Sequence, residues 1–434
     1  MTPLALDAKS QADTTKAEVL TEAIVSGVRA QKNAPYAVAN VGRKALQDFS
    51  GTGKELPFLL STTPGVLSWS GNGLGIGTSY LRIRGAGDSR INVTVDGVPL
   101  NSPEDQCVFW ANMNSYSALM ESVQIQRGVG SSTNGDGAFG GSVALRTKAP
   151  SYDPFVELNA SYGSYNTYNT GFSMSTGLLG NHFVADAAFH TTGTDGYIHG
   201  TAGKSGSWYA GLNWIGRDFI IRYRNIGNYE HTGQAWNGVT AGTDDLSIMD
   251  GTYGKNTGIK TYADMYREGL GKFNSLYESM DPKTYETTRY TLNDGSYWPK
   301  TTDNFWQDHN ILSAAWNINE NLKTTLSLHY TYGYGYYDEF KPDSKVSKFG
   351  FDMVKSNGKP LRSDFVRQKG LSQNAAGVVY NISYNNNGWD VIGGLSGQMF
   401  WGNHFGYLTY VSNKDVVNHY PGLAGLNDTD FDNG

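Results

Sequence analysis

The sequence predicts a membrane β-barrel with an amino-terminal α+β domain, and three observations support this fold class. Glycine is abundant, with 54 of 434 residues, and the chain also holds 28 tyrosines and 10 tryptophans. Charged residues make up only 17% of the chain, against roughly 25% in ordinary globular proteins. The second half consists of segments in which apolar and polar residues alternate. A helical bundle is therefore not expected.

The alternation is clearest in residues 322–334. Even positions there are Leu, Thr or Tyr, whereas odd positions are Lys, Thr, Ser, His or Gly. Such a strand has one apolar and one polar face, and several of these segments approach the ~9 to 11 residues with which a tilted strand crosses a bilayer. We expect about nine antiparallel strands of this kind, at residues 155–162, 172–178, 183–189, 208–214, 219–223, 312–318, 322–334, 376–384 and 389–401.

The connections between these strands differ in length. They are short after residues 178 and 214 and between residues 316 and 322, but long over residues 228–305 and 338–372. Short turns at one end and long loops at the other are typical of outer-membrane barrels, which also have aromatic girdles and a polar lumen.

The first half has a different texture. Short apolar strands are expected at residues 81–85, 91–101 and 122–130, and Asp96-Gly97 is a strong hairpin dipeptide. A polar leader precedes them and contains one apolar segment, TEAIVSG, at residues 21–27. An extended segment on a tether suits a peptide that adds a strand to a partner's sheet, although an edge strand of the following domain would look the same.

Four segments occur in an order that resembles the plug domain of TonB-dependent outer-membrane receptors. They are ELPFLLSTTPGV (55–66), LRIRG (81–85), VTVDGVP (93–99) and ESVQIQRGVGSSTNGDGAFGGSVALRT (121–147). The resemblance implies a flexible leader in residues 1–30, a plug domain in residues 31–150 and the amino-terminal part of a transmembrane barrel in residues 151–434. It also makes TEAIVSG the TonB box, formed by Thr21, Glu22, Ala23, Ile24, Val25, Ser26 and Gly27.

The resemblance further implies roles for two arginines of the plug. Arg84 and Arg127 resemble the family's arginines that pair with wall glutamates and latch the plug in place. They can also be read as solvated charges at strand ends. Apical plug loops at residues 70–79 and 101–110 are expected to contact substrate, with candidate residues Asn72, Asn101, Glu104, Phe109 and Trp110.

A size comparison suggests that the barrel has more strands than this chain supplies. A plug of ~120 residues is roughly 35 Å across, whereas a ten-stranded barrel spans only ~20 Å and a 22-stranded one ~44 Å. We therefore expect the chain to be an amino-terminal portion of a 22-stranded receptor. Residues 1–8 lack the basic and apolar regions of a signal peptide. Because the other features predict a protein of the Gram-negative outer membrane, we expect a missing or misplaced start.

Several other classes of function are not supported. Basic residues are scattered and the net charge is -6, so a nucleic-acid partner is not expected. Cys107 is the single cysteine, and the eight histidines lack the spacing of a metal site. We find no nucleophile with a base and an oxyanion site, and we expect neither enzymatic activity nor a bound cofactor or metal.

The sequence thus predicts a receptor for energised uptake of a scarce large nutrient, most readily a ferric siderophore or a cobalamin-like cargo. Its expected partners are TonB with its inner-membrane energising complex, outer-membrane lipid, and an iron chelate or other small nutrient. A TonB-dependent glycan importer, a passive porin-like channel and a surface adhesin are the alternatives.

Overall fold

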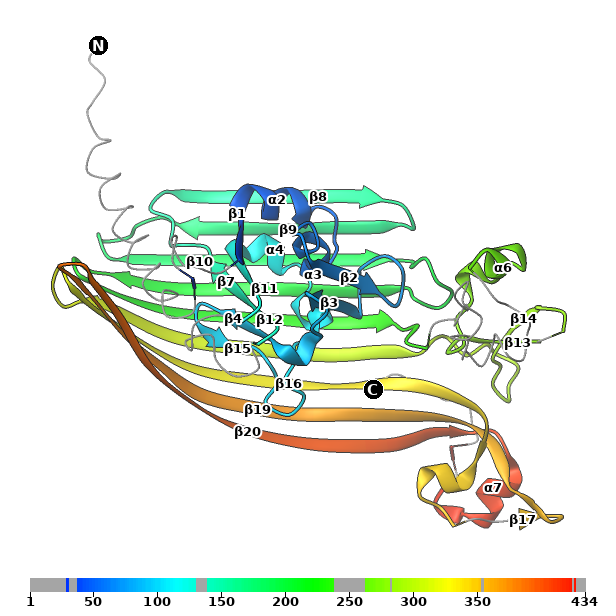
Figure 1. Cartoon of the computed structure of the whole chain (residues 1–434). Coiled ribbons are helices and arrows are strands. Elements are labelled where there is room, and N and C mark those ends of the chain that lie inside the picture. Colours follow the sequence, from blue (N-terminus) through cyan, green and yellow to red (C-terminus); the bar gives the residue numbers. More distant parts are fainter. Residues whose placement is uncertain are drawn as a thin grey trace.

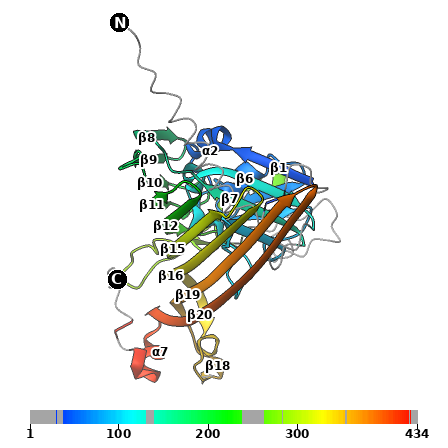
Figure 2. The same ribbon diagram turned by 90° about the vertical axis from the view of Figure 1, so that its left-hand side faces the viewer.

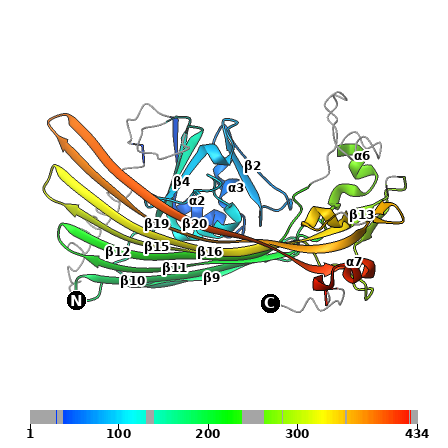
Figure 3. The same ribbon diagram turned by 90° about the horizontal axis from the view of Figure 1, so that it is seen from below.

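The computed structural model describes residues 29–30, 37–129, 139–237, 262–281, 283–352, 355–423 and 425–426. They form a small amino-terminal domain and a long curved sheet, and the domain lies against the concave face of the sheet (Figure 3). The fold class predicted from the sequence is confirmed. No described helix is long and apolar enough to span a membrane.

The amino-terminal domain is built on a five-stranded sheet in the order β1-β6-β7-β4-β5. All neighbours are antiparallel except β4 and β7, which are parallel. Strands β2 and β3 pair separately as a hairpin. The elements are β1 (Ala37–Gly42), α2 (Arg43–Ser50), α3 (Leu56–Leu60), β2 (Val66–Ser70), β3 (Ser79–Ile83), η1 (Asp88–Arg90), β4 (Ile91–Val95), β5 (Val98–Pro99), η2 (Trp110–Met113), α4 (Tyr116–Leu119), β6 (Met120–Arg127) and β7 (Gly141–Thr147).

Burial of apolar side chains holds this domain together. Val93, Val123 and Leu145 of the sheet are almost completely buried, as is Leu46 of α2. The same core continues into the long sheet through buried residues such as Ile226. The expected hairpin at Asp96-Gly97 is present, with φ of 47° and 81° at these two residues. Positive φ at both positions is the requirement of a type I′ turn.

The long sheet, which we call the wall, contains nine strands, and each strand pairs with the next strand of the wall along the chain (Figures 1 and 2). All eight pairs of neighbours are antiparallel, and within the described residues β8 and β20 are the two edges. The strands are β8 (Pro154–Gly163), β9 (Thr167–Thr176), β10 (Phe183–Thr194), β11 (Gly203–Ile215), β12 (Phe219–Gly233), β15 (Thr302–Asn317), β16 (Leu322–Lys345), β19 (Arg362–Asn386) and β20 (Trp389–Val411). All nine predicted strands are therefore present.

The wall is polar on its concave face and apolar on its convex face. Leu158, Leu212 and Leu328 are exposed, whereas Ser207 and Asn213 are buried beneath the amino-terminal domain. This is the reverse of a soluble protein and matches a wall whose outer face meets lipid.

The connections divide the wall into two ends. Residues 177–182, 216–218, 318–321 and 387–388 make the short connections at the turn end. The loop end carries connections 164–166, 195–202, 234–301 and 346–361, and its small elements gather on one side of Figure 1. They are α6 (Tyr262–Arg267), η4 (Leu270–Lys272), β13 (Glu278–Met280), β14 (Thr287–Arg289), η5 (Val346–Phe349), β17 (Lys355–Ser356), β18 (Lys359–Pro360), α7 (Lys414–His419) and η6 (Pro421–Leu423).

One predicted connection is wrong in extent. Residues 338–372 were expected to form a long loop, but β16 and β19 are 24 and 25 residues long and stay paired out to Lys345 and Arg362. The tips of these strands are stabilised by a small apolar cluster that includes Val346, Phe365 and Val416. This packing extends the hairpin well beyond the length that a bilayer requires.

Candidate functional site

A cavity of about 840 Å³ lies between the amino-terminal domain and the loop-end half of the wall. We call it the loop-end cavity. The domain contributes residues from β3, η1 and the segment before η2, and the wall contributes residues from β12, β15, β16, β19 and β20. Aromatic side chains dominate the lining, and they are Tyr80, Phe109, Trp110, Trp236, Phe305, Tyr336, Tyr337 and Phe405.

The loop at residues 70–78 is fastened to the wall beside this cavity. The Trp236 indole N–H donates to the Thr78 hydroxyl at 3.3 Å, and Thr78 also bonds to Gln234. Gly77 has a φ of +82°, and a Cβ at this position would lie 3.0 Å from the Cβ of Thr232. Glycine therefore allows the loop to approach the wall this closely. The loop therefore cannot move without breaking contacts with the wall.

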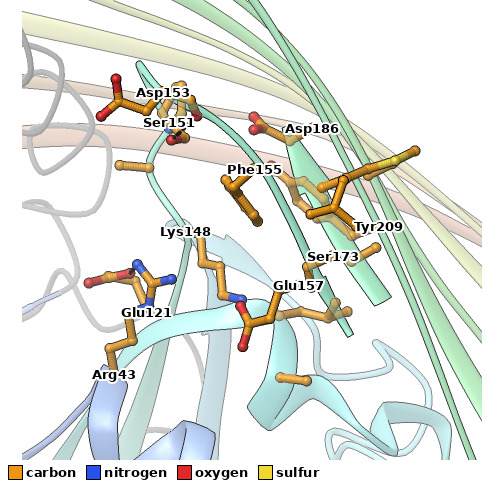
Figure 4. Close-up of a pocket in the computed structure, with 18 of the residues that line it drawn as sticks. Arg43, Glu121, Lys148, Ser151, Asp153, Phe155, Glu157, Ser173, Asp186 and Tyr209 are labelled. Carbon is orange, nitrogen blue, oxygen red and sulfur yellow. Dashed lines mark hydrogen bonds and ion pairs between the residues drawn. The ribbon is translucent and has the colours of Figure 1, made fainter. Parts of the chain in front are cut away.

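A second cavity, of about 540 Å³, lies near the turn end and is drawn in Figure 4. Its lining is charged, and the Lys148 side chain points towards Glu157 of β8. Arg43 faces Glu121 at 3.8 Å on the side of the amino-terminal domain. Burial and the nearby Arg43 lower the pKa of Lys148.

A buried ion pair joins the domain to the wall between the two ends. Asp96, in the hairpin after β4, pairs with Arg224 of β12, and the two side chains are only 1% and 0% exposed. Thr147 also holds the Asp96 carboxylate, because its N–H and its hydroxyl donate to Asp96 at 2.9 and 2.6 Å. Arg222 lies alongside and donates to the Lys148 carbonyl at 2.8 Å.

These contacts keep the Asp96 carboxylate ionised. Burial alone would raise the pKa of Asp96, but the guanidinium groups of Arg224 and Arg222 and the Thr147 hydrogen bonds hold it below its usual range. The pair therefore acts as a charged clamp between the amino-terminal domain and the wall.

The family of the amino-terminal domain is identified by its sequence. Residues 30–142 match the family model of the TonB-dependent Receptor Plug Domain. This domain is a TonB-dependent receptor plug. No curated protein matches the chain in sequence. The family is one of outer-membrane β-barrel receptors rather than enzymes.

Solved structures of this family share the fold of plug and wall. The ferric-catecholate import receptor Fiu from E. coli K12 aligns with a TM-score of 0.56 at 14% identity, over 85% of this chain and 50% of that chain. The ferric preacinetobactin receptor BauA from Acinetobacter baumannii gives 0.57 at 11%, over 89% and 51%. The ferripyoverdine receptor of the Pseudomonas aeruginosa outer membrane gives 0.57 at 11%, over 89% and 45%. The chain thus spans about half the length of these receptors.

The structure places the two predicted latch arginines at the ends of plug strands, Arg84 after β3 and Arg127 at the end of β6. Arg127 donates to the Pro64 carbonyl at 2.7 Å, and Arg84 has φ of 50° in the turn after β3. In the described part of the chain neither makes an ion pair. Their pairing with wall glutamates stays a prediction. The buried pair between Asp96 and Arg224 has the opposite polarity, because the carboxylate belongs to the plug and the arginine to the wall.

The predicted substrate residues occupy different places. Phe109 and Trp110 both line the loop-end cavity, but Phe109 is 53% exposed while Trp110 is 2% exposed and belongs to the plug core. Glu104 accepts a hydrogen bond from His404 of β20 at 2.7 Å. Asn101 and Asn72 are engaged in their own loops. Asn101 bonds to the backbone of Val93 and Ile91, and Asn72 bonds to the Ile76 carbonyl.

Tyr80, Phe305 and Tyr337 could not be singled out from the sequence. No local motif marks these positions, since each becomes a cavity residue only when the wall curves around the plug. The proposed TonB box, Thr21–Gly27, lies outside the described residues. Within the described residues no group of three or more His, Cys, Asp or Glu side chains is arranged to hold a metal ion.

Proposed function

We propose that this chain is part of a receptor that takes up a ferric siderophore or a cobalamin-like cargo across the outer membrane of a Gram-negative bacterium. The loop-end cavity carries the proposal, because its volume of about 840 Å³ falls in the range of ligand sites, roughly 300–1,000 Å³. The printed names of the similar structures describe receptors for ferric chelates. Aromatic faces suit the apolar surface of such a chelate.

In this proposal cargo enters at the loop end and the plug blocks its further passage. The clamp between Asp96 and Arg224 has to open before the plug can move. TEAIVSG would then add a strand to the sheet edge of TonB, and the inner-membrane complex would supply the work. The receptor itself makes and breaks no covalent bond.

Deleting Thr21–Gly27 tests the proposal. We expect uptake of cargo to be abolished and binding at the cell surface to be unchanged, because the segment would contact TonB and not the cargo. Uptake and binding of a radiolabelled ferric chelate or cobalamin by cells are the two measurements. Deletion of residues 10–16, seven residues of the same leader, is the matched control and should leave uptake intact. Unchanged uptake after the first deletion would instead favour a passive channel.

The position of Phe109 leads to a second expectation. Replacing Phe109 with alanine should weaken cargo binding about five- to thirtyfold, the effect of losing an aromatic contact worth about 1 to 2 kcal/mol. It should leave stability nearly unchanged, because the ring is 53% exposed. Equilibrium binding of the same labelled chelate checks this. Trp110→Ala is the contrasting variant, and it should destabilise the plug by about 3 to 5 kcal/mol because the ring is buried. Binding by Phe109→Ala that equals the wild type would remove this residue from the site.

A further inference from the structure

The charged residues of the loop-end cavity are mostly acidic. Two carboxylates come from the plug, Asp88 and Asp105, and two from the wall, Glu230 and Asp303. The cations in the same lining are Lys369 and His404. His404 is already bonded to Glu104 at 2.7 Å. Glu230 and Asp303 are buried and interact with each other, so Asp88 and Asp105 are the carboxylates whose charge a ligand would meet.

The two plug carboxylates are only partly compensated by nearby positive groups, because burial raises the pKa of each more than Arg82 lowers that of Asp88 or His404 lowers that of Asp105. Across the described residues none of the four takes part in an ion pair. Burial and the neighbouring Glu104 raise the pKa of Asp105, so a positive group placed beside it would relieve an existing repulsion. The acidic character of the cavity is therefore available to a ligand.

Asp88 is held by a hydrogen bond, and the backbone that carries Asp105 is held by its loop. Asp88 accepts a hydrogen bond from the Leu81 N–H at 3.2 Å. Asp105 lies in a tight loop closed by bonds from the Ser102 N–H to the Cys107 carbonyl, at 2.8 Å, and from the Gln106 N–H to the Ser102 carbonyl, at 2.7 Å. A carboxylate on a fixed backbone has less freedom to lose when it pairs with a bound charge than one on a mobile loop.

The aromatic side chains of the cavity also favour a positively charged ligand. The faces of Tyr80, Phe109 and Trp236 line the cavity together with the acids, and aromatic faces attract cations through their quadrupole. A polyanion such as a ferric tris-catecholate would bring like charge to these carboxylates, which disfavours binding.

We propose that the loop-end cavity selects a metal chelate that carries a positive group or no net charge, and that Asp88 and Asp105 set this preference. The inference rests on the proposed function, because it concerns the cargo of that same cavity. It names charge as the property by which this receptor discriminates between otherwise similar chelates.

The test uses two series of closely related ligands that differ mainly in charge. Ferrioxamine B is a cationic ferric trihydroxamate, its N-acetyl derivative is neutral and its N-succinyl derivative is anionic. Aquocobalamin, cyanocobalamin and a cobalamin monocarboxylate form a second series in the same order. We expect one series to bind the full chain in detergent, with the Kd rising about five- to tenfold at each step from cation to anion.

Two variants assign the effect to the plug. Asp88→Asn with Asp105→Asn should reduce each step to about twofold, with resistance of the plug to protease as the check that it still folds. Asp218→Asn makes the same change in an exposed turn at the opposite end of the wall, and it should keep the full preference.

Equal affinities within a series, or the reverse order, would overturn the charge preference alone. A preference that survives in the double variant would overturn the role of the two aspartates. Binding of neither series would contradict both the preference and the proposed cargo.

Discussion

Replacing Arg224 with alanine is expected to destabilise the docked plug by about 3 to 5 kcal/mol, the usual cost of removing one partner from a buried ion pair. The cost is high because Asp96 would keep its charge in a position that is 1% exposed. Amide hydrogen exchange of β4 and β7 measures the result, since Asp96 follows β4 and Thr147 ends β7. Exchange in both strands should become faster by the factor that corresponds to this free energy.

The second partner provides the decisive comparison. Asp96→Asn keeps one oxygen to accept from the Thr147 N–H, offers an amide N–H that can donate to the Thr147 hydroxyl, and removes the charge. The double variant Asp96→Asn with Arg224→Ala should therefore be more stable than Arg224→Ala alone. Arg217→Ala is the control, because Arg217 is 87% exposed in a turn and its 3.7 Å pair with Asp218 is worth at most about 1 kcal/mol. If Arg224→Ala and Arg217→Ala had the same small effect, Asp96 and Arg224 would not clamp the plug.

The wall could be predicted from sequence because its physics is local. A strand with one face towards lipid and one towards a polar lumen must alternate apolar and polar residues, so each of the nine strands can be recognised from its own sequence. The plug could be predicted only from the order of four segments, since a mixed domain buries its strands on both faces. Val93, Val95 and Asn92 are all buried in β4, although their sequence alternates as if one face were exposed.

The ends of strands and the partners across the plug-wall contact could not be predicted. Residues 339–345 and 362–372 are polar enough to read as a loop, and their pairing depends on an apolar cluster assembled from three separate segments. Asp96 reads as a turn residue, and the turn is present. Its second role, as the carboxylate that meets Arg224, depends on a contact 128 residues away in the chain. Only the docked plug brings the two together.

The plug also contains a buried carboxylate whose ionisation should make stability depend on pH. Glu55 is 1% exposed, and its carboxylate accepts a hydrogen bond from the Gly77 N–H at 2.5 Å. Burial nevertheless raises the pKa of Glu55 from 4.5 to about 7. The folded plug therefore holds the Glu55 proton more tightly than the unfolded chain does.

Because the folded pKa is the higher one, this contribution to stability is fully present below pH 4.5 and is lost as the pH rises to about 7. Over that window the plug should lose roughly 3 kcal/mol, at about 1.4 kcal/mol per pH unit. Glu55→Gln should remove this slope, because an amide neither gains nor loses charge, whereas Glu320→Gln in an exposed turn should retain it. The urea concentration at which the plug becomes sensitive to protease, measured across the window, gives the slope for each protein. A Glu55→Gln variant with the slope of the wild type would assign the dependence to groups of the wall and not to Glu55.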